Sequence, residues 1–258
     1  MDFQAKFLGG GGEHHRYFSV SEADADGIYE IIKDFWTNRT DKKDEEIKAV
    51  IQGYRQGNFH ASMEDIRNKV SELYGDKERT PEQPFSMIDF GGASGSIYYV
   101  MKELFDEATL RYVLVEPYKP FVDDFLAIFS NQHAITADSV QFAKMEDSAL
   151  GEKPFDVFFS SHVLYLIKPS EVREVLKRAA QLTNTILLGD NLQNINGEFD
   201  KENPVIFDYF IEGKQIYFSH YFEGYFEDIG FEIVETIPTI PRGPEIKPDF
   251  GMILARRK

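Results

Sequence analysis

Apolar residues in the first third of the chain recur at the spacing of amphipathic helices. Ile28, Ile31, Ile32 and Phe35 lie on one face of a helix, and Ser21 precedes them as an N-cap. The same period predicts two more helices, one through 47–54 and one through 66–74. The linker 75–84 ends this region, so we expect an N-terminal helical cap or lid over residues 1–83. The glycine-rich segment 1–20 predicts either a mobile lid or a disordered tail.

From Phe85 onward the pattern changes to short apolar runs that alternate with helical periods. Such alternation is typical of βαβ units and a parallel sheet. Residues 84–258 are therefore expected to form an α/β core, with an irregular, aromatic-rich cap insertion at about 192–229. Strands are expected at 87–90, 112–115, 134–136, 155–161, 185–188, 231–236 and 252–255.

Composition and charge narrow the class of protein. The 258 residues carry a formal charge of −16, which argues against a nucleic-acid partner and against docking on an anionic membrane. There is no cysteine, so disulfides and thiolate metal sites are excluded. No leader-like segment or apolar run of membrane-spanning length is evident, and we expect a cytoplasmic enzyme or binding protein.

The stretch PFSMIDFGGASG, residues 84–95, combines a buried strand with a glycine-rich turn and the start of a helix. This layout favours a nucleotide-type crevice, because glycines allow a sharp bend and a close approach of ligand to backbone amides. The dinucleotide spacing G-x-G-x-x-G fails in every register, and no Lys-Ser/Thr pair follows as a phosphate loop requires. The form acid-x-G-x-G-x-G fits better, with Ala93 at the middle glycine. Its other members are Asp89, Gly91 and Gly95, with Gly92 between them.

This turn resembles motif I of the class I S-adenosylmethionine-dependent methyltransferases, and the resemblance extends over residues 84–258. It implies a Rossmann-like fold with a seven-stranded, mostly parallel sheet and a reversed C-terminal edge hairpin. It also implies S-adenosyl-L-methionine as cofactor, bound by the turn. Glu116, followed by Pro117, matches the acid that binds both ribose hydroxyls.

The third and fourth strands carry the rest of the resemblance. Asp138 matches the carboxylate that accepts from the adenine amino group, and the backbone amide of Ser139 would meet the ring. Glu146 and Asp147 are alternatives for that acid. FDVFFSSHVLYLI, residues 155–167, is similar to the family's fourth strand and places Ser160 and Ser161 at its end.

The segment after the fourth strand narrows the class of acceptor. A magnesium-dependent catechol-type enzyme needs a carboxylate there, but Ser160, Ser161 and His162 occupy the place, although Asp190 and Asn191 would supply the second pair. The Asn/Asp-Pro-Pro-Tyr motif of base and glutamine methyltransferases is absent. A metal-independent N- or O-methyltransferase of a small molecule is therefore expected.

The segments IDFGGASG, VEP and SHVLYLI also resemble the histamine N-methyltransferase branch, in which a Gln stands at the position of His162. His162 is the first candidate to orient or deprotonate the acceptor, with Tyr165 beside it and His220 as a second candidate base. Tyr17, Tyr54, Asp190, Asn191 and Tyr221 are candidates for acceptor binding. Two alternatives stay open: a non-catalytic adenosylmethionine-binding protein or partner subunit, and a protein or peptide methyltransferase. The protein is expected to be a monomer or a homodimer.

Overall fold

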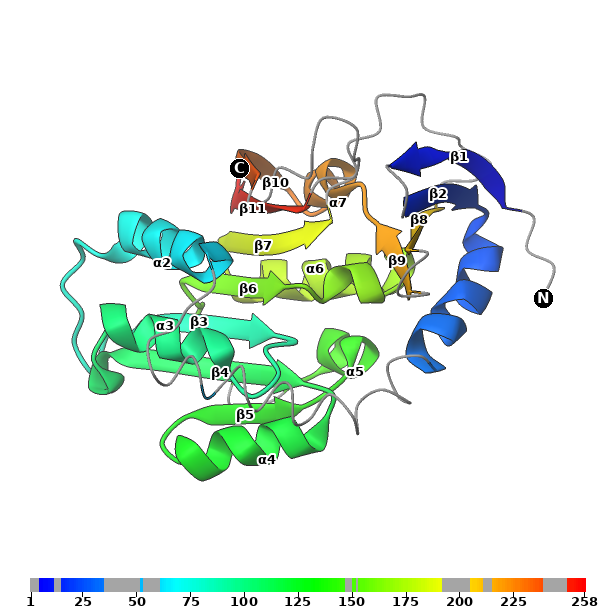
Figure 1. Ribbon diagram of the computed structural model, residues 1–258. Coiled ribbons are helices and arrows are strands. Elements are labelled where there is room, and N and C mark those ends of the chain that lie inside the picture. The colour runs from blue at the N-terminus through cyan, green and yellow to red at the C-terminus, as the bar shows by residue number, and fades with distance from the viewer. Residues whose placement is uncertain are drawn as a thin grey trace.

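A seven-stranded sheet forms the centre of the molecule (Figure 1). The computed structural model describes residues 5–11, 15–34, 52, 61–146, 150–151, 153–191, 205–210, 215–238 and 250–258. The strand order is β10-β11-β7-β6-β3-β4-β5, parallel except that β11 runs antiparallel to both β7 and β10. The reversed edge hairpin predicted from the sequence is confirmed. The strands are β3 (Phe85–Phe90), β4 (Leu110–Glu116), β5 (His133–Thr136), β6 (Val157–Ser161), β7 (Thr185–Asn191), β10 (Phe231–Pro238) and β11 (Phe250–Arg257).

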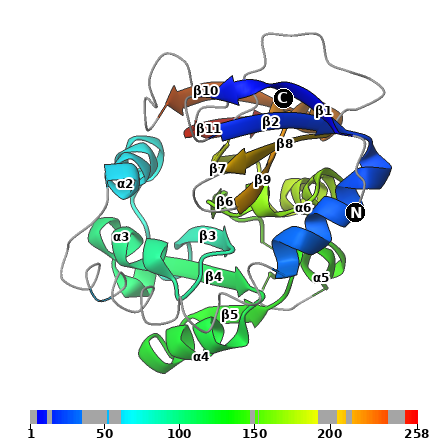
Figure 2. The same cartoon turned by 45° about the vertical axis from the view of Figure 1, so that its right-hand side comes forward.

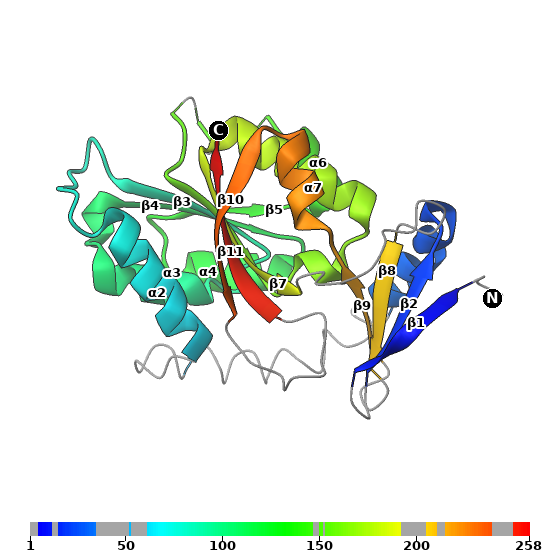
Figure 3. The same ribbon diagram turned by 90° about the horizontal axis from the view of Figure 1, so that it is seen from above.

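Helices cover both faces of this sheet, which explains why its central strands are apolar on both sides. Along β3, Ile88 and Phe90 enter the core under α5, α6 and α7, whereas Phe85 and Met87 enter the core under α2, α3 and α4. Figure 3 shows α2, α3 and α4 on one side of the sheet and α6 and α7 on the other. The helices are α2 (Ala61–Tyr74), α3 (Ser96–Leu104), α4 (Lys119–Ile128), α5 (Ser139–Lys144), α6 (Pro169–Leu182) and α7 (Phe222–Asp228).

A second, antiparallel sheet of four strands lies beyond the carboxyl ends of the parallel strands (Figures 1 and 3). Its order is β1-β2-β8-β9, so the N-terminal hairpin pairs with strands inserted after β7. The bounds are β1 (Lys6–Gly11), β2 (His15–Val20), β8 (Val205–Phe210) and β9 (Gln215–Ser219).

This sheet corrects two expectations. Residues 6–11 and 15–20 are strands rather than a tail, so the N-terminal region is not helical throughout. The insertion, expected to be irregular, contains β8, β9 and α7. The physical reason is pairing between distant segments, since backbone hydrogen bonds from β8 to β2 override the flexibility of the neighbouring glycines.

Residues 22–34 form the first predicted helix, which packs on the small sheet. The Ser21 hydroxyl accepts from the Asp24 backbone N–H at 3.1 Å, which confirms the predicted N-cap. Ile28 and Ile32 join Val205, Phe207 and Phe218 in one core cluster. The second predicted helix, 47–54, lies outside the described residues except for Gln52, which is helical. The third is α2.

The strand order reverses at β3, which has β4 on one side and β6 on the other. In open α/β sheets the ligand crevice forms outside the carboxyl ends of the strands at such a reversal. The glycine-rich turn follows β3 directly, so the fold places it at the mouth of that crevice.

Candidate functional site

The glycine-rich turn has a geometry that most other residues would disturb. Gly91 has φ +75°, its N–H donates to the Val115 carbonyl at 2.7 Å, and a Cβ there would overlap the Val163 side chain. A Cβ on Gly92 would overlap the carboxylate of Asp89. Ala93 also has a positive φ, +49°, which an L-residue adopts at a cost. The turn is therefore tightly packed against its neighbours, and its backbone rather than its side chains faces the crevice.

Asp89 lies beneath this turn rather than in the open crevice. Its side chain is 1% exposed, and it accepts a hydrogen bond from the hydroxyl of Tyr112. Burial raises the pKa of Asp89 to about 7, with a further contribution from the charge of Glu116. Asp89 is predicted from the sequence as part of the cofactor-binding turn, and in the structure its buried carboxylate lies against the backbone of Gly92.

Glu116 joins the turn to the end of β4. Its Oε2 accepts from the Ala93 N–H at 3.1 Å, and its Oε1 accepts from the Tyr118 N–H at 3.0 Å. Burial raises the pKa of Glu116 to about 7, and both backbone hydrogen bonds oppose that rise. The structure thus brings Glu116 and the turn together, with a carboxylate at the crevice that can accept hydrogen bonds from a ligand.

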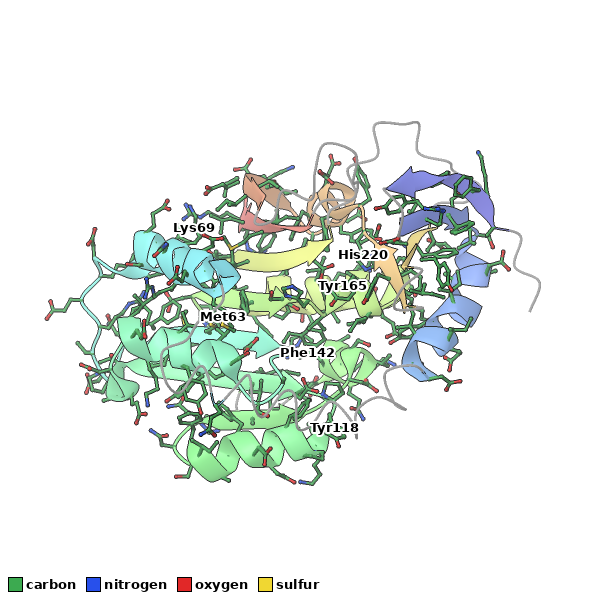
Figure 4. All side chains as sticks on the ribbon, in the orientation of Figure 1. Met63, Lys69, Tyr118, Phe142, Tyr165 and His220 are labelled. Atoms are coloured by element: carbon green, nitrogen blue, oxygen red, sulfur yellow. The ribbon has the colours of Figure 1, made fainter. Side chains whose placement is uncertain are left out.

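The neighbours of Glu116 begin helix α4. Pro117 is exposed, and the ring of Tyr118 lies edge-on to Phe121 with centroids 4.8 Å apart. Figure 4 shows Tyr118 and Tyr165 on the side of the sheet where β4 and β6 end. Tyr118 was not singled out from the sequence, because an aromatic residue at a helix start is common.

Asp138 and Ser139 lie at the carboxyl end of β5, as predicted. The carboxylate of Asp138 is exposed and caps α5 by accepting from the Gln141 N–H at 2.8 Å. Ser139 is buried, and its hydroxyl donates to Glu171. The alternative Glu146 is exposed beyond the end of α5, and Asp147 lies outside the described residues.

The end of β6 forms the opposite wall of the crevice. Ser160 is buried and donates to the Phe90 carbonyl at 3.0 Å, which is a structural role. The Ser161 hydroxyl lies 2.9 Å from His162 Nδ1. His162 has φ +59°, and its N–H donates to the Gly189 carbonyl at 2.8 Å while its side chain is exposed. A non-glycine residue held at positive φ is uncommon and is found more often at functional sites.

Tyr165 follows in the short helix η2 (Leu164–Leu166). Its N–H donates to Asp190 Oδ2 at 3.3 Å, and its ring lies edge-on to Tyr217 of β9 with centroids 4.8 Å apart. Asp190, predicted from the sequence as an acceptor-binding residue, is fully buried and supports η2 through this hydrogen bond. Asn191 ends β7, and its side chain lies outside the described residues.

His220 is not placed to act as a base. It is fully buried, and its Nε2 lies 2.7 Å from the Leu164 carbonyl, so Nε2 carries the proton and donates. Burial lowers the pKa of His220 to about 4, which keeps the ring neutral. His220, labelled in Figure 4, directly follows β9 and links it to η2 through this hydrogen bond.

The remaining acceptor candidates fall in different places. Tyr17 lies on β2 and is 9% exposed, whereas Tyr221 is exposed at the start of α7. Tyr54 lies outside the described residues. Sequence reasoning missed Ser94, whose buried hydroxyl has no hydrogen-bond partner within the described part of the chain. Its position inside the turn was the only available signal.

Within the described ranges, no group of three His, Asp or Glu side chains is arranged to hold a metal ion. None of the helices in those ranges is both long and apolar enough to cross a membrane.

No known protein-family profile matches the sequence, and no curated protein matches it. Solved structures do. Magnesium protoporphyrin IX methyltransferase (ChlM) from Synechocystis PCC 6803, with bound SAM, superposes with a TM-score of 0.51 at 14% identity, over 77% of this chain and 80% of that one. CalS10, an amino pentose methyltransferase from Micromonospora echinaspora, also with bound SAM, gives a TM-score of 0.50 at 10% identity, over 80% and 95%. The N-terminal domain of EvdMO1, with SAH bound, gives 0.50 at 14% identity, over 75% and 80%.

These structures give no support to the histamine N-methyltransferase branch, and at such identities the likeness concerns the fold. The chain therefore has the Rossmann-like fold of the class I S-adenosylmethionine-dependent methyltransferases.

Proposed function

We propose that this protein is an S-adenosylmethionine-dependent methyltransferase that acts on a small molecule without a metal. The observation that carries the proposal is the position of Glu116, whose carboxylate bridges the amides of Ala93 and Tyr118 at the reversal of strand order. The turn lacks the glycine spacing of a dinucleotide site and the Lys-Ser/Thr pair of a phosphate loop, whereas an adenosine without phosphate offers ribose hydroxyls to this carboxylate.

The chain's own residues then have defined tasks around the cofactor. The turn 91–95 presents backbone to the methionyl end, Glu116 accepts from the ribose, and the Asp138–Ser139 segment borders the adenine. When bound, the cofactor supplies a methyl group on a sulfonium, which a nucleophile takes by in-line displacement. Ser94 is an added candidate here, because its buried hydroxyl would gain a partner from a ligand in the turn.

For the acceptor, we assign the principal role to His162. It is exposed at the end of β6. The hydrogen bond from its backbone N–H to the Gly189 carbonyl fixes the position of the backbone that carries the imidazole. A neutral imidazole at that place can orient a nucleophile or take its proton. Tyr165 forms the adjoining wall, with its ring centroid 6.4 Å from that of His162. We propose either nitrogen or oxygen as the methylated atom, a cytoplasmic location and a monomeric or homodimeric state.

The proposal is tested by incubating the purified protein with labelled S-adenosylmethionine and a panel of small amines, phenols and carboxylic acids. We expect formation of S-adenosylhomocysteine together with one product whose mass is higher by one methyl group. Tight cofactor binding with no turnover across the panel would favour a non-catalytic binding protein. Absence of cofactor binding would overturn the proposal.

A further inference from the structure

One face of the four-stranded sheet is polar although it is buried. Directly paired residues of an antiparallel sheet point to the same face, and Tyr17, Asp208 and Tyr217 pair across β2, β8 and β9. The next row on this face is Ser19, Ile206 and Ser219. We call these six residues the polar face.

The two faces of this sheet differ in the side chains that they bury. Phe18, Phe207 and Phe218 pair on the opposite side and pack with the helix 22–34. On the polar face, Asp208 is 4% exposed, Ser19 1% and Ser219 3%. The hydroxyls of both serines lack a hydrogen-bond partner in the part of the chain that the structure describes. Buried polar groups in this state are costly, and a bound ligand is one of the few ways to satisfy them.

The polar face adjoins the crevice through a row of rings. Tyr217 lies edge-on to Tyr165, and Tyr165 lies edge-on to His162 at the end of β6. Figure 1 shows β8 and β9 beyond the carboxyl ends of the parallel strands, on the side where Figure 4 places Tyr165. An acceptor held on this face would therefore reach toward His162.

We propose that the polar face binds the acceptor through a protonated amine, which lies against Asp208 between the rings of Tyr17 and Tyr217. The inference rests on the proposed function and specifies its substrate class. A carboxylate removed from water favours a cation over a neutral or anionic group, and tyrosine rings on both sides attract the same charge. The overall charge of −16 also attracts cationic molecules toward the protein.

The test compares isosteric ligands on wild-type protein and on Asp208→Asn. Phenethylamine and phenethyl alcohol are titrated calorimetrically into protein saturated with S-adenosylhomocysteine. We expect the wild type to bind the amine at least tenfold more tightly than the alcohol. Asp208→Asn should lose at least tenfold of the amine affinity and leave the alcohol affinity unchanged. Asp228→Asn, an exposed acid at the end of α7, is the matched control and should behave as wild type.

Equal binding of amine and alcohol by the wild type, or no binding of either, would overturn the inference. So would an Asp208→Asn variant with unchanged amine affinity. If that variant does not fold, Tyr217→Leu, which removes one ring, should weaken the amine at least threefold. The affinity for S-adenosylhomocysteine is measured on each protein. A wild-type protein that does not bind S-adenosylhomocysteine refutes the proposed function. A wild-type protein that binds it but does not prefer the amine to the alcohol refutes only this inference.

Discussion

The hydroxyl of Tyr29 donates a 2.9 Å hydrogen bond to the carboxylate of Glu171, and Ser139 donates to the same carboxylate. Tyr29 belongs to the helix 22–34, which Figure 2 shows in blue beside α5, and Ser139 is the first residue of α5 at the predicted adenine edge. Burial and the charge of Glu171 raise the pKa of Tyr29, so the hydroxyl stays protonated as a donor. Lys168 adds a second link by pairing with Asp26 at 2.6 Å. The N-terminal helix is thus tied to the segment expected to bind adenine.

Tyr29→Phe removes one hydrogen bond of this link and keeps the ring. We expect the free energy of unfolding to fall by about 1 kcal/mol, and amides of the helix 22–34 to exchange hydrogen faster. The affinity for the cofactor should also fall, because the Tyr29 hydroxyl no longer helps to hold the Glu171 carboxylate to which Ser139 donates. Denaturant titration and hydrogen exchange measure these effects, with the exposed Asp34→Asn on the same helix as control. Unchanged exchange in the variant would refute the link.

The buried carboxyl of Glu116 predicts that cofactor binding depends on pH. Its pKa is raised from 4.5 to about 7, so below pH 7 it is increasingly protonated in the unliganded protein. Ribose hydroxyls bind the ionised form better, so affinity should rise from pH 5.5 to 7.5 and binding near pH 6.5 should release protons. Calorimetry in buffers of different ionisation enthalpy detects the release. Proton uptake, or binding that is independent of pH, would contradict the account.

Ala93 is the one residue of the turn that departs from the glycine pattern. Its φ of +49° is costly for an L-residue, so Ala93→Gly should stabilise the protein by about 1 kcal/mol. Ala127→Gly, in the ordinary helical backbone of α4, should destabilise it by about 1 kcal/mol. Urea unfolding of the two variants gives the comparison. The same sign for both would show that Ala93 is not strained.

His162 should affect turnover and not cofactor binding. His162→Asn removes the imidazole with a residue that tolerates positive φ, so the backbone at the end of β6 is kept. We expect turnover to fall by about 100-fold, in the range of a lost acid–base group, and S-adenosylhomocysteine affinity to stay within about twofold. Rate measurements with the acceptor found in the panel, alongside calorimetry, separate the two. An equal loss of both would place His162 in the cofactor site instead.

The sequence predicted the parallel sheet well because each strand and the helix after it are close in the chain. The turn after β3 and the position of Glu116 follow from the same local pattern. The small sheet was not predictable in this way. Its central pair joins Tyr17 to Asp208, and nothing in the glycine-rich segment before Tyr17 indicates that partner.

The burial of individual polar residues could not be predicted from the sequence either. His220 and Asp190 have the residue types expected of a site, but their roles depend on contacts with Leu164 and Tyr165 from other segments. Asp208, by contrast, is not a candidate from the sequence but belongs to the proposed acceptor site. It lies in an aromatic-rich stretch that the sequence pattern indicates to be irregular. Only the register of β8 shows that it shares a face with Tyr217.

The most direct test of the central claim is the affinity of Glu116→Ala for S-adenosylhomocysteine. Removing the carboxylate leaves the Ala93 and Tyr118 amides and the ribose hydroxyls without their acceptor, so binding should weaken by about 1–3 kcal/mol. Glu232→Ala, an exposed glutamate on β10, should bind as the wild type does. A folded Glu116→Ala variant with unchanged affinity would contradict the claim that this turn and this carboxylate form the cofactor site.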